Sequence, residues 1–554
     1  MAANGVRGDG ARQQARGRKA GRAADGRWDR TAKGTAVPTP NGGAAGGGSL
    51  GAGPRRGRRV LRLSATGLAA LILATSGAGY LYYEHLNGNI QKGERSSGDS
   101  KAHRAGANAA GQTPLNILLI GSDSRNSDAN VRLGGSKASR GNPPLGDVQM
   151  LIHLSADRTS ASVVSIPRDT RVDIPQCEDP DTGRTYPATN GIINESLARG
   201  GAGCTLATWE NLTGVYVDHW MTIDFAGVVS MADAIGGVDV CVNQNVWDRP
   251  LPGVPGGSGL KLTAGTKKVK GEQALQWLRT RHAWGSDPLR ARAQHMYLNS
   301  MIRILKAQNV FTDSGRLMDL AEAATKSLKV SSEIGTVKKL YDLGTQLKTV
   351  PTNRITMTTM PAVADPQDDD HLLPDGDRAE KMWTMLRDDV PFDDQGTATS
   401  GKQSAAPAKA SKEPSADDGS IGVVVQNATG SASLAPVTGR AGTIAQELVG
   451  KGFTRAGKDS TAGLTEEKTV VRYPSAELEG DAQRVAEALG IPLSSVKRST
   501  DVSAVTVVVG ADWRTGAAYP KESAPKAGDL PDNADAINGS DAKQCMDVYA
   551  PYRF

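Results

Sequence analysis

The sequence predicts an α/β fold, a three-layer sandwich with a mixed central sheet, followed by a smaller α/β domain and preceded by a single transmembrane helix. Three observations predict it. Short apolar runs alternate with helical patterns over residues 114–392, and a shorter alternation occupies residues 419–513. An uncharged stretch of 21 residues, Leu63–Tyr83, stands before both. Such alternation is typical of α/β domains, and 554 residues suffice for two or three domains.

The first 59 residues are basic, with thirteen Lys or Arg against three Asp or Glu and few large apolar side chains. Such a segment buries too little surface to offset its ordering entropy, so residues 1–59 are predicted to be a disordered tail. A basic tail is compatible with nucleic-acid binding. It is equally compatible with the cytoplasmic flank of a membrane helix.

The uncharged stretch decides between these interpretations. About 20 apolar residues cross a bilayer as a helix, so residues 60–86 are predicted to be an anchor. A cluster of five arginines precedes the stretch and three tyrosines lie at its far end: Arg55, Arg56, Arg58, Arg59, Arg62, then Tyr80, Tyr82 and Tyr83. The positive-inside rule then places the N-terminus in the cytoplasm and the large domains outside the cell membrane, away from nucleic acid. A cleaved signal peptide is the alternative, but its basic flank would be too long.

Four cysteines, Cys177, Cys204, Cys241 and Cys545, fall on the predicted outer side, without zinc or CxxC spacing. In an oxidising compartment they indicate two disulfides, for which three connectivities are possible. Cys177 with Cys204 is the favoured pair because both stand in Pro- and Gly-rich, loop-like surroundings. That choice leaves Cys241 to pair with Cys545.

A polar stalk is predicted for residues 87–113, and order is expected to begin at Leu115. Strand-like runs follow at residues 116–121, 148–154, 161–166, 219–224, 237–242, 276–281 and 354–361. Helical patterns occur at residues 205–214, 225–235 and 289–306. Interleaved runs of this kind predict the sandwich over residues 114–392.

Residues 393–418 are rich in Ser, Ala, Pro and Lys and are predicted to be a linker. The second domain, residues 419–513, shows strands at 422–427, 469–474 and 504–510, with helices near 439–450 and 480–489. It contains neither Cys nor His, and we expect a binding module. The tail, residues 514–554, is expected to be mobile apart from Cys545.

Charged residues gather where the predicted strands end, the edge at which open α/β sheets bind ligands. They are Asp123 and Arg125 after the first run, Asp147 before the second, Arg168 after the third, and Arg279, Arg281 and Arg290 near the sixth. Taken singly, each could be a cap, a turn residue or a solvated charge. Taken together they indicate a site for a polyanion with a divalent metal, because arginine forks match phosphate oxygens and two carboxylates can hold Mg²⁺. His153 is expected in the core, and His282 and His295 are at most secondary contacts.

The same residues carry a family resemblance. The segments NILLIGSDSR, VVSIPRDT, LTGVYVDHWMTIDFAGVVSMADAIGGVDVCV and LRTRH…SDPLRARAQ resemble the successive motifs of LytR-CpsA-Psr proteins, in order, over roughly residues 114–310. Residues 420–513, with VVVQNATG, LVGKGF, TVVRYP and VVVGADW, resemble the LytR-type accessory domain found on many members.

The resemblance implies a phosphotransferase that moves a glycopolymer from a polyprenyl-pyrophosphate lipid to peptidoglycan in cell-wall assembly, with Mg²⁺ as cofactor. Asp123 and Asp147 match the metal-binding carboxylates, and these two with Arg168 form the implied catalytic group. The matching pyrophosphate-binding residues are Arg125, Arg168, Arg279, Arg281 and Arg290, and Gln294 matches the glutamine of the last motif.

This chain departs from the family pattern at several positions. Leu145, Gly146, Asp147 and Val148 stand where members usually have Arg-Ser-Asp-Thr, so one arginine and one hydroxyl are missing. Ala293, Gln294 and His295 stand where Arg-Gln-Gln is frequent, and Gly191–Asn194 where Lys-Ile-Asn is usual. These departures leave two alternatives to transfer: a weakly active or inactive protein that binds polyprenyl pyrophosphates or wall polymers, and a lipid pyrophosphatase that uses water as acceptor. A transcriptional regulator is disfavoured, because the tail has no helix-turn-helix or zinc pattern.

Overall fold

The computed structural model describes residues 55–108, 110–134, 140–307, 314–395, 412–430, 435–459, 465–466, 468–520 and 525–554, with side chains from Val60 onward. Residues 1–54 of the predicted disordered tail and most of the predicted linker fall outside the described residues, whereas residues 55–59 of the tail are helical.

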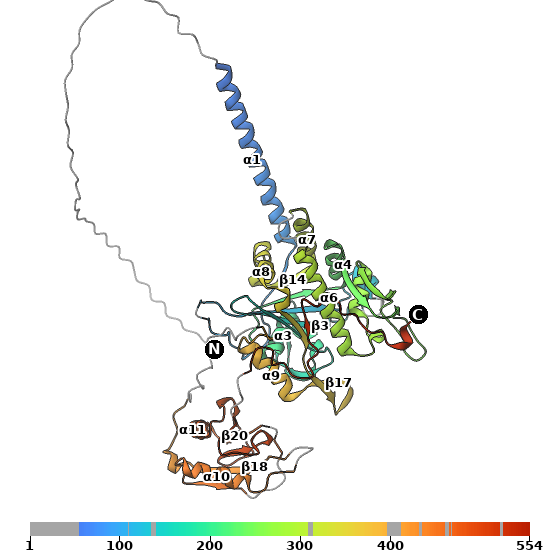
Figure 1. The fold of residues 1–554 in the computed structure, drawn as a ribbon. Coiled ribbons are helices and arrows are strands. Elements are labelled where there is room, and N and C mark those ends of the chain that lie inside the picture. The colour runs from blue at the N-terminus through green and yellow to red at the C-terminus, as the bar shows by residue number, and fades with distance from the viewer. Residues whose placement is uncertain are drawn as a thin grey trace, which may run out of the picture. The chain divides into compact units, whose positions relative to one another are not determined.

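A mixed eight-stranded sheet lies at the centre of the large domain, in the order β1–β14–β9–β2–β3–β4–β15–β23 (Figure 1). Its strands are β1 (Gln91–Gly93), β14 (Leu328–Ser331), β9 (His219–Ile223), β2 (Leu115–Ser122), β3 (Gly146–Leu154), β4 (Ala161–Ser165), β15 (Ile355–Thr359) and β23 (Ile537–Asn538). Antiparallel pairing joins β2 to β3 and β3 to β4, whereas β9 pairs with β2 and β4 with β15 in parallel. The mixed sheet predicted from the sequence is confirmed.

Helices cover both faces of this sheet (Figure 1). Side chains alternate along a strand, so Leu118 and Ile120 of β2 join one core and Ile117 joins the other. The helices are α3 (Ser196–Thr213) and α9 (Gly376–Arg387) on the first face, and α6 (Asp287–Ala307) and α8 (Val337–Thr349) on the second. This arrangement is the predicted three-layer sandwich.

Shorter elements complete the large domain. The helices are α2 (Asp128–Gly134), α4 (Phe225–Ala234), α5 (Glu272–Arg279) and α7 (Ser314–Ser327). Two-stranded pairs are β5 (Arg171–Ile174) with β8 (Thr189–Ile192), β6 (Cys177–Glu178) with β7 (Thr185–Tyr186), β10 (Val238–Val242) with β13 (Gly265–Val269), β11 (Val246–Trp247) with β12 (Lys261–Leu262), and β16 (Ala362–Asp365) with β17 (Asp368–Pro374).

The strand predicted at residues 276–281 is wrong, because this segment is the end of α5 and the turn after it. Ala274, Leu275 and Trp277 are buried on one side of the helix, which is the spacing of an amphipathic helix. Helix α5 ends at Arg279, and Thr280 is already extended. Arg279 therefore lies at the end of a helix and Arg281 in the turn after it, rather than both on one strand.

The predicted stalk is folded onto the large domain. Strand β1 pairs in parallel with β14, and Arg95 forms a 2.8 Å ion pair with the buried carboxylate of Glu210. Further along, the Ser97 hydroxyl donates to the carbonyl oxygen of Gly200 at 2.5 Å. Two polar residues of the predicted stalk, Arg95 and Ser97, are thus hydrogen-bonded to α3. Composition alone does not predict such long-range contacts.

The C-terminal residues 525–554, here called the C-terminal strap, are also packed on the large domain rather than mobile. Strand β23 pairs antiparallel with β15. Four apolar side chains of the strap are buried in the core that contains α5 and α6: Ile537, Met546, Val548 and Tyr552. Because these residues are scattered among Pro, Asp and Gly, no periodic pattern in the sequence predicts their burial.

Two disulfides join Cys177 to Cys204 and Cys241 to Cys545, which confirms the favoured pairing. The first fixes the β6–β7 hairpin to α3. The second links β10 to the C-terminal strap across a sequence separation of 304 residues. Long-range cross-links of this kind restrict the unfolded chain most.

We expect Cys545→Ser to lower the free energy of unfolding of the large domain by about 2–4 kcal/mol, because the variant frees the strap from β10. Chemical denaturation of the full chain under oxidising conditions measures the change. Cys241→Ser should give the same loss, since both variants remove one bond. Equal stability of wild type and both variants would show that the strap is held without the disulfide.

The second domain is a five-stranded sheet with two helices, in the order β19–β18–β22–β20–β21 (Figure 1). Its elements are β18 (Val423–Asn427), α10 (Arg440–Gly450), β19 (Ala456–Lys458), β20 (Val470–Tyr473), α11 (Glu479–Leu489), β21 (Val496–Arg498) and β22 (Val505–Val509). Phe453 and Trp513 are fully buried in its core. The strands and helices predicted here are all present.

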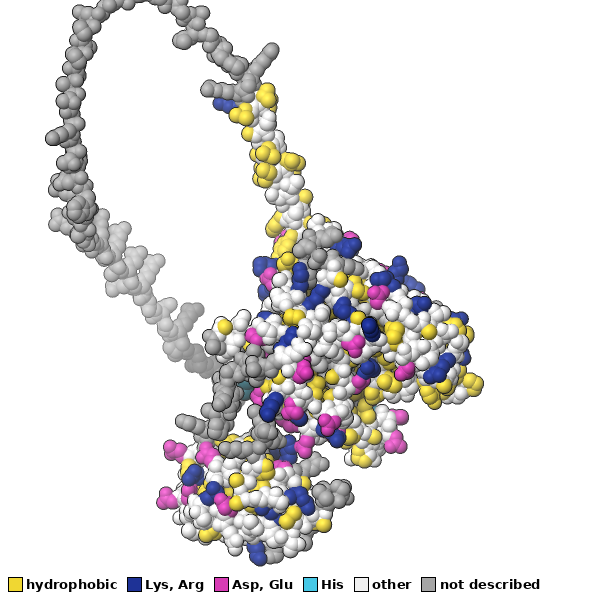
Figure 2. All heavy atoms as spheres, in the orientation of Figure 1, with side chains coloured by type: hydrophobic (Ala, Val, Ile, Leu, Met, Phe, Trp, Pro, Cys, Tyr) yellow, Lys and Arg dark blue, Asp and Glu magenta, His cyan; other side chains and the backbone are white. Residues whose placement is uncertain are grey.

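The predicted anchor lies in helix α1 (Arg55–Asn89). Its segment Val60–Asn89 is long and apolar enough to cross a membrane, with a mean hydropathy of 1.5 in an exposed window. Apolar side chains along this helix stand out in Figure 2. Its length and apolar composition suit this helix to anchoring the chain in a membrane.

Candidate active site

The eight residues predicted to form a site all line one pocket of about 360 Å³ at an edge of the central sheet. They are Asp123, Arg125, Asp147, Arg168, Arg279, Arg281, Arg290 and Gln294. The pocket also includes His282, expected as a secondary contact at most, and residues that sequence reasoning did not select, among them Asp224, Asp248 and Ser258.

Sheet topology explains why distant residues meet here. Strands β2 and β3 are antiparallel, so Ser122 at the end of β2 pairs with Gly146 at the start of β3. Strand β4 is antiparallel to β3 in turn, and its end leads the chain to Arg168 at the same edge. Strand β9 runs parallel to β2 and delivers Asp224 and helix α4. One edge of the sheet therefore collects the ends of β2, β4 and β9 and the start of β3.

Asp123 is clamped to the loop that precedes β3. Its N–H donates to the Leu145 carbonyl oxygen at 3.1 Å, and its Oδ1 accepts the Leu145 N–H at 2.7 Å. Burial raises the pKa of Asp123, and the negative charge of Asp147 adds to that rise, whereas the Leu145 N–H opposes it. The two carboxylates thus repel each other, and a cation placed between them would relieve the repulsion.

Arg168 lies between two carboxylates. Its Nη1 donates to Asp147 Oδ1 at 3.0 Å, and its Nε donates to Asp169 Oδ2 at 3.2 Å. Burial opposes the charge of this guanidinium, but Asp147 and Asp169 outweigh burial and raise the pKa of Arg168. These contacts orient Arg168 at the rim of the pocket.

Arg125 and Arg279 form a pair of like charges. Both donate to the carbonyl oxygen of Gly134, at 3.1 and 3.5 Å. Both guanidinium carbons lie near the Phe225 ring, at 5.8 and 4.8 Å from its centre. Burial lowers the pKa of Arg279, and the charge of Arg125 lowers it further. Since arginine stays protonated in proteins, the fold holds concentrated positive charge here, which a bound polyanion would neutralise.

Arg281, Arg290 and Gln294 come from the turn after α5 and from α6. Arg290 is buried and pairs with Asp287 at 3.0 Å. Gln294 donates its amide to the Leu278 carbonyl oxygen at 3.0 Å. Arg281 is exposed, and it forms no ion pair with any residue that the structure describes. The turn that carries Arg281 is supported by the C-terminal strap, since Tyr552 stacks on His282 with ring centres 6.2 Å apart.

Two acidic residues of the pocket were missed. Asp224 caps helix α4 by accepting the Gly227 N–H at 2.8 Å. Asp248 is buried, and one of its oxygens has no hydrogen-bond partner while the other accepts the Ser258 N–H at 2.7 Å. A position directly after a strand could have revealed Asp224. Asp248 also directly follows a strand, but β11 is only Val246–Trp247, which is too short to be recognised in the sequence.

The donor set fits Mg²⁺ only in partnership with a phosphate ligand. Within the described ranges, no group of three or more His, Cys, Asp or Glu side chains is arranged to hold a metal ion. Asp123 and Asp147 line the pocket as a pair. Magnesium is commonly held by one or two carboxylates together with substrate phosphates and water. The two carboxylates therefore suit a magnesium ion that arrives with a phosphorylated substrate.

His153 and His282 lie where the sequence led us to expect them, and His295 is more deeply buried than expected. His153 is buried between Asn116, at 2.7 Å from Nδ1, and Asp389, at 3.0 Å from Nε2. His282 lines the pocket. His295 is fully buried, and neither ring nitrogen has a partner within the described structure. His295 therefore belongs to the core rather than to the site.

Burial lowers the pKa of His295 to about 4, whereas an unfolded histidine titrates near its ordinary value of about 6.5. Protonation thus favours the unfolded chain as the pH falls from about 6.5 towards 4. From pH 7 to pH 5, His295 should remove about 2 kcal/mol of stability. Denaturation of wild type and His295→Leu at both pH values measures this difference. Parallel losses in the two proteins would contradict the assignment.

Two parts of the chain are similar to known protein families. Residues 80–388, more than half of the chain, match the LytR_cpsA_psr family. The chain belongs to the LytR_cpsA_psr family. Residues 420–513 match a second family, described as LytR cell envelope-related transcriptional attenuator. The site residues named above from the large domain all fall within the first match.

Relatives within the LytR_cpsA_psr family include cell wall biosynthesis protein LcpA of Corynebacterium glutamicum, which is 28% identical over 82% of this chain and 87% of its own length. The polyisoprenyl-teichoic acid–peptidoglycan teichoic acid transferase TagU of Enterococcus faecalis is 23% identical over 51% of this chain and 83% of its own. Among solved structures, TagV of Bacillus subtilis is 23% identical over 50% of this chain and 97% of its own, with a TM-score of 0.38.

Proposed function

We propose that this chain is a phosphotransferase that attaches a polyprenyl-pyrophosphate-linked glycopolymer to peptidoglycan. The observation that carries the proposal is the pocket in which five arginines and four carboxylates meet. Arg125 and Arg279 donate to the same carbonyl oxygen, and neither forms an ion pair with a residue that the structure describes, an arrangement that favours a multiply charged anion such as pyrophosphate. The names of the relatives from Corynebacterium glutamicum and Enterococcus faecalis support a role in wall assembly.

In the proposed reaction, the oxygen of a peptidoglycan hydroxyl forms a bond to the phosphorus that carries the glycopolymer. The bond from this phosphorus to the bridging oxygen breaks, and polyprenyl phosphate leaves with the electron pair. The hydroxyl proton passes to a carboxylate. Asp123 is the better placed of the two candidates, because Asp147 is already paired with Arg168.

The arginines act by binding and orienting the pyrophosphate. Arg168, Arg279 and Arg281 would donate to its oxygens and neutralise the charge that develops on them, which is where most catalysis of phosphoryl transfer resides. Mg²⁺ held by Asp123 and Asp147 together with the phosphates would add a further positive charge at this position. The carboxylates of Asp147 and Asp169 keep Arg168 in place before substrate arrives.

Two alternatives keep the same pocket. Leu145 stands where the family usually has an arginine, and its side chain lines the pocket while its backbone clamps Asp123. A protein that binds the lipid without reacting, or one that hydrolyses it with water, would use the same arginines. The purified full chain, given a labelled lipid-pyrophosphate oligosaccharide and peptidoglycan fragments, separates the three. Labelled peptidoglycan supports transfer; free labelled oligosaccharide phosphate alone, or no product, contradicts it.

We further propose that α1 anchors the chain in the cell membrane. The N-terminus then lies in the cytoplasm, and the large domain and the second domain lie outside. The cluster of arginines before Leu63 and the tyrosines at the far end of the apolar stretch support this orientation. Protease added to intact protoplasts should digest both large domains and spare a tag at the N-terminus. Loss of the tag with protection of the domains would reverse the orientation.

A further inference from the structure

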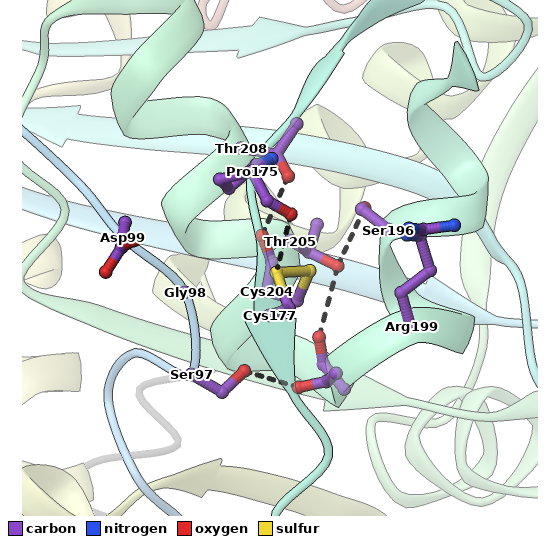
Figure 3. Close-up of a disulfide and its surroundings, with 12 residues drawn as sticks. Ser97, Gly98, Asp99, Pro175, Cys177, Ser196, Arg199, Cys204, Thr205 and Thr208 are labelled. Carbon is purple, nitrogen blue, oxygen red and sulfur yellow. Dashed lines mark hydrogen bonds between the residues drawn. A yellow bond between two sulfur atoms is a disulfide. The ribbon is translucent and has the colours of Figure 1, made fainter. Parts of the chain in front are cut away.

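A hairpin held by a disulfide stands beside the candidate site. In the β6–β7 hairpin, Cys177 pairs directly with Tyr186. Cys177 is also bonded to Cys204 of α3, so the strand opposite Tyr186 is fixed covalently to a core helix (Figure 3). On its other side, Glu178 donates its N–H to the Ser97 carbonyl oxygen at 2.8 Å. Tyr186 is therefore presented by a rigidly supported hairpin.

Two guanidinium groups gather at the Tyr186 ring. The Cζ atoms of Arg184 and Arg199 lie 4.6 and 5.5 Å from its centre. Arg199, which stands to one side of the disulfide in Figure 3, donates to the Pro187 carbonyl oxygen, while its Nε is buried without a partner. Neither arginine forms an ion pair with another residue of the described structure. Arg184 of the hairpin and Arg199 of α3 thus place two positive charges at Tyr186, and no described residue forms an ion pair with either.

These residues form one wall of a groove of about 620 Å³. The groove shares Asp123, Arg125 and Leu145 with the candidate active site, so the two cavities meet along these three residues. Glu195 and Ala198 continue the wall of the hairpin side. A ligand lying in the groove would therefore reach Asp123 at its inner end.

We propose that this groove binds the acceptor of the transfer reaction, a peptidoglycan glycan whose sugars carry carboxylate groups, through Arg184, Tyr186 and Arg199. The inference rests on the proposed function and adds to it the place and chemistry of the second substrate. Arginine forks match carboxylates in a bidentate manner. The Tyr186 ring offers an apolar surface to the face of a sugar, and Glu195 can accept hydrogen bonds from sugar hydroxyls.

The reaction geometry favours the acceptor over the donor as the occupant. In phosphoryl transfer, the attacking and leaving oxygens lie roughly in line through phosphorus, so they occupy different sides of it. The apolar side chains of the active-site pocket come mainly from α4 and α5, and they suit the prenyl end of the leaving group: Phe225, Val228, Leu275 and Leu278. Among the described residues that line the groove, none belongs to α4 or α5. The groove thus opens on the side available to an incoming hydroxyl.

Steady-state transfer by the full chain in detergent tests the proposal. The donor is a labelled lipid-pyrophosphate oligosaccharide, and the acceptor is a soluble peptidoglycan glycan fragment with free carboxylates. In the Arg184→Gln/Arg199→Gln double variant, the KM for the acceptor should rise about tenfold or more, while the donor KM and the hydrolysis of donor by water should stay within about twofold of wild type. Tyr186→Phe should keep the acceptor KM, and Tyr186→Leu should raise it.

Arg249→Gln is the matched control, because Arg249 also lies over an aromatic ring, 4.8 Å from the centre of Trp247, but lines neither cavity. A wild-type chain that transfers nothing overturns the proposed function. An active wild type with an unchanged acceptor KM in the double variant overturns the groove assignment alone. A rise in the donor KM in place of the acceptor KM assigns the groove to the donor glycan and overturns the proposal as well.

Discussion

Replacement of Arg279 or Arg281 by lysine should reduce the rate of glycopolymer transfer about a hundredfold or more, as loss of a preorganised donor to a developing charge does elsewhere. Lysine keeps the positive charge but replaces a planar fork with a single point donor. Arg281 is the sharper probe of the two. It is exposed, so Arg281→Lys should change the melting temperature little. Transfer of a labelled lipid-pyrophosphate oligosaccharide by the full chain measures the rate.

Arg292→Lys provides the control for this series. Arg292 lies two positions from Arg290 on α6, but it pairs with Asp535 of the C-terminal strap and does not line the pocket. Its lysine variant can keep that ion pair, so transfer should continue at the wild-type rate. Near-full rates in both Arg279→Lys and Arg281→Lys would show that these arginines are solvated charges rather than ligands of the pyrophosphate.

Asp147→Ala should abolish the binding of Mg²⁺ that accompanies a pyrophosphate lipid. Asp123 and Asp147 line the same pocket, where their negative charges repel each other. Burial is the main cause of the raised pKa of Asp123, and the charge of Asp147 adds to the rise. With Asp147 gone, the metal site loses one of its two negatively charged protein ligands, and only Asp123, the phosphates and water remain to hold the ion. Calorimetric titration of Mg²⁺ into the full chain, with the lipid present, gives the affinity.

Asp169→Ala serves as the comparison for Asp147. Both carboxylates contact Arg168, but Asp169 does not line the pocket. If the metal lies between Asp123 and Asp147, Asp169→Ala should keep the affinity for Mg²⁺ and Asp147→Ala should lose it. Equal affinity in the two variants would remove Asp147 from the metal site.

The strand ends of the large domain could be predicted because their signal is local. An apolar run such as that of β2 ends abruptly at Asp123, and the run of β4 is followed closely by Arg168. A buried sheet needs apolar side chains on both faces, so the change to charge marks its edge. Sequence alone therefore found eight charged or polar residues that meet in the pocket, although it missed Asp224 and Asp248 and did not give the distances between the side chains.

Helix α5 was mistaken for a strand because the window considered was too short. Residues 276–281 contain Trp277 and Thr280, which favour strands. Extended back to Glu272, the same region shows Ala274, Leu275 and Trp277 on one side, which is the period of a helix. Arg279 still reaches the pocket, since it stands in the last turn of α5.

Long-range packing lay beyond sequence reasoning. The C-terminal strap joins the core of the large domain through Ile537 and Val548, which stand in a polar, Pro-rich segment without periodicity. The buried acid Asp248 reaches the pocket from a loop between β11 and β12. Only Cys545 hinted at such contacts, because its sole remaining partner lay far away in the chain.

Mass spectrometry of lipids that co-purify with the full chain in detergent tests the central claim most directly. The account predicts a polyprenyl pyrophosphate that is enriched over bulk phospholipid in the wild type and depleted in an Arg125→Ala/Arg279→Ala variant. These two residues are chosen because their guanidinium groups donate to the same Gly134 carbonyl oxygen in the pocket. Circular dichroism of the variant controls for folding. Bulk phospholipid alone, or equal amounts of polyprenyl pyrophosphate in wild type and a folded variant, would contradict the assignment of this pocket to a lipid-linked pyrophosphate.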